Sequence, residues 1–583
     1  MDNPCFNKMK YSELLKLNKE LSSKFESNRY QINVISNIIV HQLKEILEYR
    51  LRTEGINAYT EFGDYDNIVQ DSHKYSKSNA IIIFWELSNI VDGLQYKIEL
   101  YEEVQFNELL KKTKAEIDLV LTNLEKTSLV LINKFTSLPF QYQNIRRKKI
   151  DELASHLNQH LEKKLPANAR IVDIEKVIAS VAVAKSLYMR YFYSSRALYA
   201  IDFFKSYAEF VKPFFMSANG KAKKALIFDC DNTLWKGILG EDGFDHIEMS
   251  TNTKDGAIFA EIQSIALALN SQGILIGLCS KNNPGDVKQI IRSHSDMQLR
   301  EEHITINKSN WSDKVSNLKE ISQELNIGLD SLVFIDDSSF EVNLIKEQLP
   351  EVTVLQVPEN LYEYPGFLQK NIGLFYNLSL TAEDQKKIGM YKQQVKRETD
   401  KKKFTDIEDY LSSLELKITI YKNDASIIPR MSQISQKTNQ FNLTTKRYTE
   451  GDIRKFLEDP NTNVYAFSVA DKFGDSGVTG LCIINNDHGN QTADIDTFLM
   501  SCRIIGRNIE YSFMDYIIGK AKEANIDKVN AKYVKTQKNE QVREFYDKYS
   551  FDMVNENELK RDYVLSLNNC KSKKLNYIEV IDG

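Results

Sequence analysis

Short apolar runs alternate with helix-like stretches through the first part of the chain. Two runs rich in Ile, Val and Phe have the length of buried strands, and apolar residues recur at helical spacing in two stretches beside them. The expected strands are residues 32–40 and 80–85, and the expected helices are residues 41–53 and 106–121. This alternation is typical of a parallel α/β sheet. We therefore predict an N-terminal α/β domain over residues 1–218.

The alternation returns after Lys223 with a second set of strands. The expected strands are residues 224–228, 274–279, 304–306 and 332–335, and the expected helices are residues 257–270, 286–292 and 312–325. This pattern predicts a doubly wound, Rossmann-like sheet, in which parallel strands end along one ligand-binding edge. We expect this second α/β domain to span residues 219–378.

The last part of the chain changes from alternating to mostly consecutive strands. A charged stretch at residues 379–403 predicts a helical connector. The expected strands are residues 414–421, 464–469, 478–484, 493–500 and 528–533, and the expected helices are residues 508–523 and 539–549. We therefore predict a C-terminal α+β domain over residues 404–583.

Composition narrows the class of protein. A chain of 583 residues is too long for one core, and its 42% hydrophobic and 27% charged residues are usual for globular domains. The net charge of -5 is small, so we expect no nucleic-acid partner. Six cysteines without a CxxC pair predict reduced thiols in a cytoplasmic protein. The N-terminus resembles no signal peptide and no apolar stretch is long enough to span a bilayer, so we expect no membrane partner.

Two carboxylates close the first strand of the second domain. Asp229 and Asp231 follow the apolar run 224–228, and strand alternation points them to the same side. One carboxylate can attack phosphorus while the other transfers a proton. We predict Asp229 as the nucleophile and Asp231 as the proton-transfer residue, and Mg²⁺ as the cofactor that such hard oxygen ligands prefer.

Other polar residues follow the neighbouring strands. We expect Asp336 and Asp337 to complete the metal shell with Asp229 and Asp231, and Lys314 to neutralise charge at the catalytic site. The expected phosphate-binding residues are Thr233, Ser280 and Lys281. A single DxD pair is often a turn or a helix cap, but complementary groups at several strand ends favour catalysis.

These residues resemble the four haloacid dehalogenase motifs in order. More narrowly, the segments FDCDNTLWKGILGEDG, LCSKNNPGDV, NWSDKVSNL and FIDDSSFE resemble the FkbH-like family, and the resemblance covers about residues 170–567. That family includes glyceryl transferase/phosphatases of polyketide assembly lines. The resemblance implies capture of the glyceryl group of 1,3-bisphosphoglycerate, loss of both phosphates, and loading of a D-glyceryl thioester onto a separate acyl carrier protein.

A thiol is required on that route, and Cys230 lies between the two catalytic acids. One interpretation makes Cys230 the transient acyl acceptor. The other makes it a small buried hydrophobic residue, because alternation turns its side chain away from Asp229 and nearby carboxylates disfavour a thiolate. Cys502, which precedes Arg503, is the next thiol to consider.

The third domain resembles the coenzyme-binding core of acyl-CoA N-acyltransferases, the GNAT superfamily. Arg503, Gly506 and Arg507 approximate that superfamily's R-x-x-G-x-G/A loop, although Asn508 replaces the last small residue. A helix start favours phosphate, so we expect phosphopantetheine of a carrier protein to bind there. By the same resemblance, Asn539 and Tyr546 are expected at the coenzyme arm. Residues 440–446 are expected either to line the arm's channel or to form a capped turn.

The first domain faintly resembles an SGNH-hydrolase-like fold. Ser36-Asn37 follows a strand where a nucleophile would lie, but no GDS motif or late Asp-x-x-His pair accompanies it. We expect a degenerate binding or scaffold domain. Eleven Tyr and Phe residues within residues 186–215 suit a buried helical face better than a cofactor site.

The leading hypothesis is a cytoplasmic FkbH-like enzyme that makes a glyceryl or related three-carbon thioester on a carrier protein. Three alternatives stay open: a stand-alone small-molecule phosphatase, an N-acyltransferase, and a non-catalytic scaffold that binds a carrier. The intact set of acids argues against the scaffold, and Asn508 weakens the N-acyltransferase.

Overall fold

The computed structural model describes residues 4–25, 29–378, 382–536, 538–570, 572–573 and 575–583. The chain divides into two compact units, one ending at Asn219 and the other beginning at Gly220. The sequence-based boundary after residue 218 lies beside this division, and the boundaries expected after residues 378 and 403 stay predictions. The expected connector begins at residues 379–381, which lie outside the described residues, and α19 (Ala382–Lys401) follows them.

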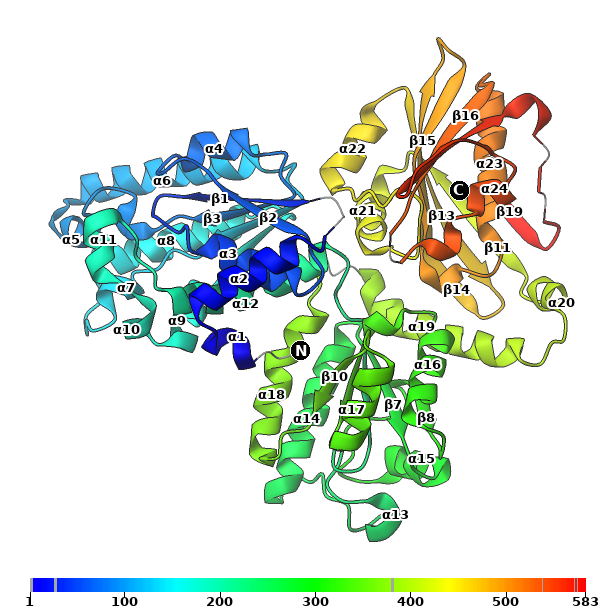
Figure 1. Cartoon of the computed structure of the whole chain (residues 1–583), viewed down its shortest axis with the longest axis horizontal. Coiled ribbons are helices and arrows are strands. Elements are labelled where there is room, and N and C mark those ends of the chain that lie inside the picture. The colour runs from blue at the N-terminus through cyan, green and yellow to red at the C-terminus, as the bar shows by residue number, and fades with distance from the viewer. Residues whose placement is uncertain (1–3, 26–28, 379–381, 537, 571, 574) are drawn as a thin grey trace. The chain divides into compact units, whose positions relative to one another are not determined.

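The first unit is built on a five-stranded parallel sheet of order β2-β1-β3-β4-β5. Its strands are β1 (Tyr30–Ser36), β2 (Ala58–Phe62), β3 (Ala80–Phe84), β4 (Leu129–Asn133) and β5 (Ala169–Val172). The helices α4 (Ile68–Lys74) and α6 (Glu103–Asn123) lie on one side of the sheet, and α3 (Leu43–Arg52) and α12 (Ile201–Ala218) lie on the other (Figure 1). The predicted parallel α/β domain is confirmed, while the SGNH-like assignment stays a prediction.

Burial explains why β3 was visible in the sequence, whereas β4, which is buried just as completely, was not predicted. Every residue of β3 and β4 is buried, as expected for strands covered by helices on both faces. The Tyr and Phe residues within residues 186–215 lie mainly on two helices. In α12 the rings of Phe203, Phe204 and Tyr207 are buried, whereas α11 (Met189–Ser195) exposes Tyr191 and Tyr193.

The second unit begins with another five-stranded parallel sheet, of order β10-β9-β6-β7-β8. Its strands are β6 (Ala225–Phe228), β7 (Leu275–Ser280), β8 (Ile304–Ser309), β9 (Leu332–Asp336) and β10 (Thr353–Gln356). Leu226 and Phe228 pack into a cluster with α14 (Lys254–Ser271) and α15 (Pro284–Ser293). Ala225 and Ile227 pack into a second cluster with α16 (Lys314–Leu325) and α17 (Ser339–Gln348). Two separate hydrophobic clusters, one for each face, are what a doubly wound sheet requires.

The rest of the second unit contains a mixed sheet of order β17-β18-β16-β15-β14-β13-β11-β19, with β12 paired to β15. Its strands are β11 (Leu416–Lys422), β12 (Phe441–Asn442), β13 (Thr462–Asp471), β14 (Gly474–Asp487), β15 (Thr492–Met500), β16 (Lys528–Val534), β17 (Asp552–Glu556), β18 (Lys560–Ser566) and β19 (Ile578–Asp582). Its main helices are α21 (Ile428–Lys437), α22 (Glu450–Glu458) and α23 (Ile509–Glu523). The helix expected over residues 539–549 is interrupted, with a 3-10 turn at Glu540–Val542 and α24 at Phe545–Lys548.

Among the described residues, no helix combines the length and apolar character needed to cross a membrane.

Candidate active site

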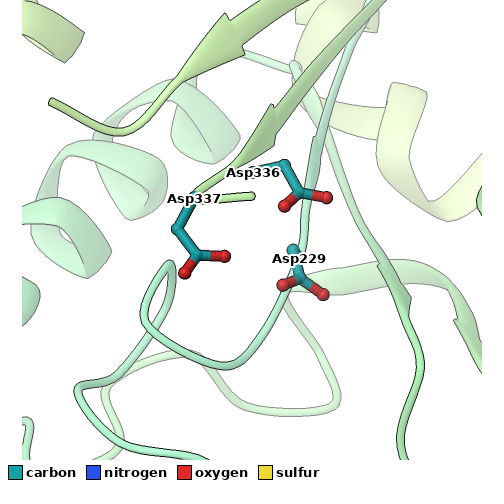
Figure 2. A group of neighbouring side chains, drawn as sticks. All are labelled: Asp229, Asp336 and Asp337. Atoms are coloured by element: carbon teal, nitrogen blue, oxygen red, sulfur yellow. The ribbon is translucent and has the colours of Figure 1, made fainter. Parts of the chain in front are cut away.

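Three carboxylates meet at the carboxyl edge of the second parallel sheet. Asp229 follows β6, and its backbone N–H donates to the Ile335 carbonyl 2.9 Å away on β9. Asp336 ends β9 and Asp337 follows it. Figure 2 shows the side chains of Asp336 and Asp337 directed toward Asp229 from the neighbouring strand. Each residue offers one carboxylate oxygen, and these oxygens lie within 4.8 Å of one another.

Lys314 joins two of these carboxylates. Asp313 caps the first turn of α16 and so fixes the position of Lys314 at the helix start. The Lys314 Nζ atom lies 2.6 Å from Asp336 Oδ2 and 3.2 Å from Asp229 Oδ1. Burial raises the pKa of Asp229, and the Lys314 ammonium partly offsets this effect. Burial alone would lower the pKa of Lys314, but Asp229 and Asp336 raise it, so the lysine stays charged.

The acidic group fits a divalent metal ion. Three carboxylates beside one ammonium leave two negative charges if all are ionised, and a buried site of this kind needs compensation. Carboxylate oxygens are the ligands that hard divalent cations prefer. The hydroxyl of Thr233 is also buried close by in the Asp229 loop, and no described residue bonds it. The residues present therefore match three of the four predicted metal ligands.

Asp231, the fourth predicted ligand, is not part of this group. Its Oδ1 accepts from Trp235 Nε1 at 3.0 Å and from the Leu239 N–H at 3.1 Å, and its Oδ2 accepts from Asn282 Nδ2 at 2.9 Å. The geometry therefore holds the Asp231 carboxylate in one orientation beside the site. Asp231 is therefore outside the group of acids that could hold a metal ion, and its proton-transfer role stays a prediction.

The predicted phosphate-binding residues differ in availability. Ser280 is buried at the end of β7, and its Oγ accepts from Asn282 Nδ2 at 3.1 Å and also bonds Asp229. Lys281 is partly exposed, but its Nζ donates to Glu341 Oε1 at 2.7 Å. A phosphate must compete with Glu341 for this lysine. Ser280 therefore contacts Asp229, whereas Lys281 is held by Glu341.

The side chain of Cys230 lies in the hydrophobic interior of the second domain. It is fully buried and belongs to the same hydrophobic cluster as Leu226 and Phe228, so it continues the alternation of β6. Burial and the Asp229 carboxylate raise the pKa of its thiol far above the ordinary range. This environment disfavours the thiolate and suits the packing interpretation, and the role of Cys230 as an acyl acceptor stays a prediction.

The predicted arginines of the third domain turn inward. Arg503 is buried, and its Nη1 contacts Met390 Sδ at 2.8 Å. Arg507 is buried as well, and its Nη1 lies 3.1 Å from Asp471 Oδ2. Between them Gly506 is exposed with φ +86°. Because both guanidinium groups are engaged inside the protein, the arrangement does not support the phosphate contacts expected of Arg503 and Arg507.

The other predicted arm-binding residues also lie in the interior. Asn539 Nδ2 donates to the carbonyls of Asn442 and Val534 at 2.9 Å each, and its Oδ1 accepts from the Thr536 N–H at 2.7 Å. Tyr546 is fully buried, and no described residue bonds its hydroxyl. Asn539 therefore holds backbone segments together rather than facing a ligand.

Ser36 and Asn37 of the first unit form a closed network. The Ser36 hydroxyl donates to the Ile38 carbonyl at 2.8 Å. Asn37 exchanges two hydrogen bonds with the backbone of Glu86, which joins the ends of β1 and β3. The Ser36 hydroxyl is thus engaged by the backbone, and the degenerate character of this domain stays a prediction.

Sequence reasoning missed Asn282, Trp235 and Glu341. Asn282 and Trp235 orient Asp231, and Glu341 pairs with Lys281. Two signals were available: Asn282 lies two residues beyond Ser280 in the same strand-end loop, and Trp235 lies four residues beyond Asp231.

The fold is shared in part with a known phosphatase-containing protein. The N-terminal part of a Bacteroides fragilis protein, which contains a phosphatase domain complexed with Mg, is 23% identical to this chain; the match covers 63% of this chain and 99% of that chain with a TM-score of 0.56. At this identity the similarity shows the fold alone.

Two acetyltransferases match a smaller share. An Escherichia coli ribosomal-protein alanine N-acetyltransferase is 8% identical over 27% of this chain and 99% of its own, with a TM-score of 0.21. Ard1 of Thermoplasma volcanium is 18% identical over 26% of this chain and 97% of its own, with a TM-score of 0.21. Scores this low carry no argument. No protein-family model matches the chain, and no curated protein matches it in sequence. What the comparisons establish is a shared fold that includes a phosphatase domain in the Bacteroides protein.

Proposed function

We propose that this chain is a Mg²⁺-dependent phosphotransfer enzyme of the haloacid dehalogenase type, with Asp229 as its nucleophile. One observation carries the proposal: a buried carboxylate at a strand end faces two further acids and one ammonium within a few ångströms. Strand ends of this kind are where open α/β sheets bind ligands. The Bacteroides fragilis protein of similar fold, solved with Mg, supports the same choice of ion.

The chain's own residues supply the groups that each step needs. An Asp229 oxygen attacks phosphorus, the bond from phosphorus to the leaving oxygen breaks, and Asp231 gives that oxygen a proton. Water then attacks the aspartyl phosphate and gives its proton to Asp231, which releases phosphate and restores Asp229. In this proposal Ser280 and Thr233 donate to phosphoryl oxygens. Mg²⁺ held by Asp229, Asp336 and Asp337 would offset the negative charge that builds up during attack.

The motif resemblance supports a narrower proposal for the substrate. The donor is 1,3-bisphosphoglycerate or a similar phosphorylated three-carbon acid, and the acceptor is the phosphopantetheine thiol of an acyl carrier protein in trans. The thiol sulfur attacks the acyl carbon, the bond from carbon to the phosphate oxygen breaks, and the thiol proton passes to solvent. The remaining phosphate ester is hydrolysed at Asp229. Burial of Cys230 favours direct transfer over an enzyme thioester.

The phosphotransfer proposal is tested by Asp229→Asn, which keeps the size of the side chain and removes the nucleophilic charge. Phosphate release from a simple aryl phosphate and from 3-phosphoglycerate should fall at least ~1,000-fold, and EDTA should abolish the wild-type activity in a way that Mg²⁺ restores. The matched control is Asp245→Asn, an exposed acid away from the cluster, which should be unaffected. A folded Asp229→Asn enzyme with normal activity would reject the proposal.

The narrower proposal is tested by intact mass spectrometry of a phosphopantetheinylated carrier incubated with the enzyme and 1,3-bisphosphoglycerate. A glyceryl adduct on the carrier is expected for the wild type and also for Cys230→Ser. Loss of loading in Cys230→Ser, with phosphate release retained, would restore the covalent role for this thiol. Phosphate release without any carrier adduct would support the phosphatase activity and contradict the transferase activity.

A further inference from the structure

The strands β15 and β16 of the third domain form a fork. They pair in parallel over only three residue pairs, from Thr492 with Lys528 to Asp494 with Asn530. Both strands then continue, to Met500 and Val534. Diverging strands leave backbone N–H and C=O groups without ladder partners, and an extended ligand can add to such groups as a strand. A pantetheine arm, with its two amides, has groups that can pair with the open strands of such a fork.

The chain's own residues bridge this fork. Phe441 and Asn442 form β12 and pair antiparallel with Met500 and Leu499 of β15. The next residue, Leu443, connects both arms. Its N–H donates to the Phe498 carbonyl of β15 at 3.2 Å, and its carbonyl accepts from the Val534 N–H of β16 at 2.7 Å. Leu443 thereby pairs with one backbone group on each arm of the fork.

Side-chain contacts hold residues 441–444 in the core of the third domain. Phe441 and Leu443 are buried, and the Phe441 ring packs edge-on against Phe545 at 5.5 Å. The Thr444 hydroxyl donates to the Asp496 carbonyl at 3.1 Å, and Asn539 donates to the Asn442 carbonyl. A flap that opens for a ligand would break all of these contacts at once.

The charges around the fork also disfavour a phosphate. Arg503 and Arg507 are buried in contacts with Met390 and Asp471. At the start of α23, Glu510 has a buried Oε2 that no described residue bonds. A carboxylate there occupies the helix terminus to which an anion would be drawn, and it repels a phosphate once it is ionised.

We infer that residues 441–444 are an internal strand ligand of the third domain, so that its fork accepts no coenzyme A or pantetheine arm. The domain instead supports the phosphotransfer domain. Lys538 pairs with Asp330, the Asn326 side chain donates to the Cys502 carbonyl, and Asn439 donates to the Gly220 carbonyl at 3.0 Å. Asp330 and Gly220 precede β9 and β6, so these contacts lie at the amino edge of the sheet, opposite Asp229. The phosphopantetheine arm of a carrier protein must then reach the carboxylate site without binding in the fork between β15 and β16.

Hydrogen exchange of the full chain tests this inference without reference to phosphatase activity. Peptides that cover residues 441–444 and 528–534 should exchange as slowly as those of β14, and 1 mM coenzyme A or pantetheine should change neither rate. Isothermal titration with either compound should show no saturable heat. Saturable one-to-one binding, or ligand-dependent exchange confined to residues 441–444 and the fork strands, would overturn the inference.

A matched pair of variants checks the bridge itself. Leu443→Pro removes the N–H that bonds Phe498, whereas Leu443→Met keeps both the N–H and the apolar bulk. Exchange over residues 528–534 should rise at least ~10-fold in Leu443→Pro and stay near wild type in Leu443→Met. Unchanged exchange in a folded Leu443→Pro protein would also contradict the bridge. A loss of phosphate release in either variant bears on the phosphotransfer proposal and not on this inference.

Discussion

The carboxylate of Asp231 is held by three donors from two loops, and Asn282 links it to Ser280, a predicted phosphate-binding residue. Asn282 touches no reacting atom, so we regard it as a positioning residue. Proton transfer depends steeply on orientation, because the donor and the leaving oxygen must meet at hydrogen-bond distance. We therefore expect conservative substitutions of the residues that orient Asp231 to lower activity strongly.

We expect Asn282→Ala to lower kcat about 10- to 100-fold with little change in KM, because binding groups remain while Asp231 loses its orientation. Asn282→Asp should move the pH profile of kcat upward, since a second carboxylate beside Asp231 favours its protonated form. The control is Asn283→Ala, whose side chain only caps α15 through the Gly285 N–H. Steady-state kinetics across pH decides the matter, and equal effects of the two alanine variants would count against the positioning role.

A second residue-scale prediction concerns Glu86 of the first unit. Its carboxyl is buried and accepts from the Tyr199 hydroxyl at 2.9 Å. Burial raises the pKa of Glu86 from 4.5 to about 7. The folded protein thus keeps this proton to a higher pH than the unfolded chain does. The stability that follows is complete below pH 4.5 and is lost as the pH rises through about 7.

The free energy of unfolding of the first unit should fall by about 3 kcal/mol between those two pH values. Glu86→Gln should flatten this dependence, whereas Glu61→Gln, at an exposed position on β2, should leave it unchanged. The pH dependence of the free energy of unfolding is measured by urea unfolding at a series of pH values, with pulsed hydrogen exchange of residues 80–89 as the readout. The same slope in Glu86→Gln and wild type would show that another group titrates.

At the scale of elements, an ion pair of the Asp471 carboxylate connects α19 to the β13–β14 hairpin. Asp471 ends β13 and lies 2.7 Å from Arg397 Nε on α19 and 3.1 Å from Arg507 Nη1. All three side chains are buried. Burial and the neighbouring Arg397 lower the pKa of Arg507 to about 10, so it stays charged at neutral pH. One carboxylate therefore compensates two buried cations.

Asp471→Asn keeps the shape and removes that compensation, so it should destabilise the third domain by about 3–5 kcal/mol. The control Glu579→Gln breaks the exposed Lys417–Glu579 pair and should cost less than about 1 kcal/mol. Urea unfolding followed by pulsed exchange of residues 464–500 compares them. Equal stability of the two variants would mean that the buried arginines have other compensation.

Strong burial made most strands predictable, although β4 is buried throughout and was missed. β3, β7 and β9 are buried throughout, so their sequences read as apolar runs. The edge strands β2 and β5 have mixed burial and gave no such run. β12 has only two residues within a polar stretch, and it exists because the fork needs partners, which no local pattern reveals.

At the scale of the whole molecule, the sequence located the carboxylate site and the α+β character of the third domain, but it did not reveal which way the arginines of that domain point. Parallel strands end at one edge, so Asp229, Ser280 and Asp336 could be brought together by topology alone. The direction of Arg507 depends on Asp471, which lies 36 positions earlier on another strand. A short motif does not reveal long-range ion pairs of that kind, so the sequence could not show that the Arg507 side chain is engaged inside the protein.

The central claim is that Asp229 becomes phosphorylated during turnover. Borohydride reduces an aspartyl phosphate to homoserine, so quenching the enzyme with borohydride during steady-state hydrolysis and mapping peptides by mass spectrometry tests the claim directly. The account predicts homoserine at position 229, dependent on both Mg²⁺ and substrate, and none at Asp231, Asp336 or Asp337. Continued phosphate release with no modification at Asp229, or modification of a different acid, would contradict it.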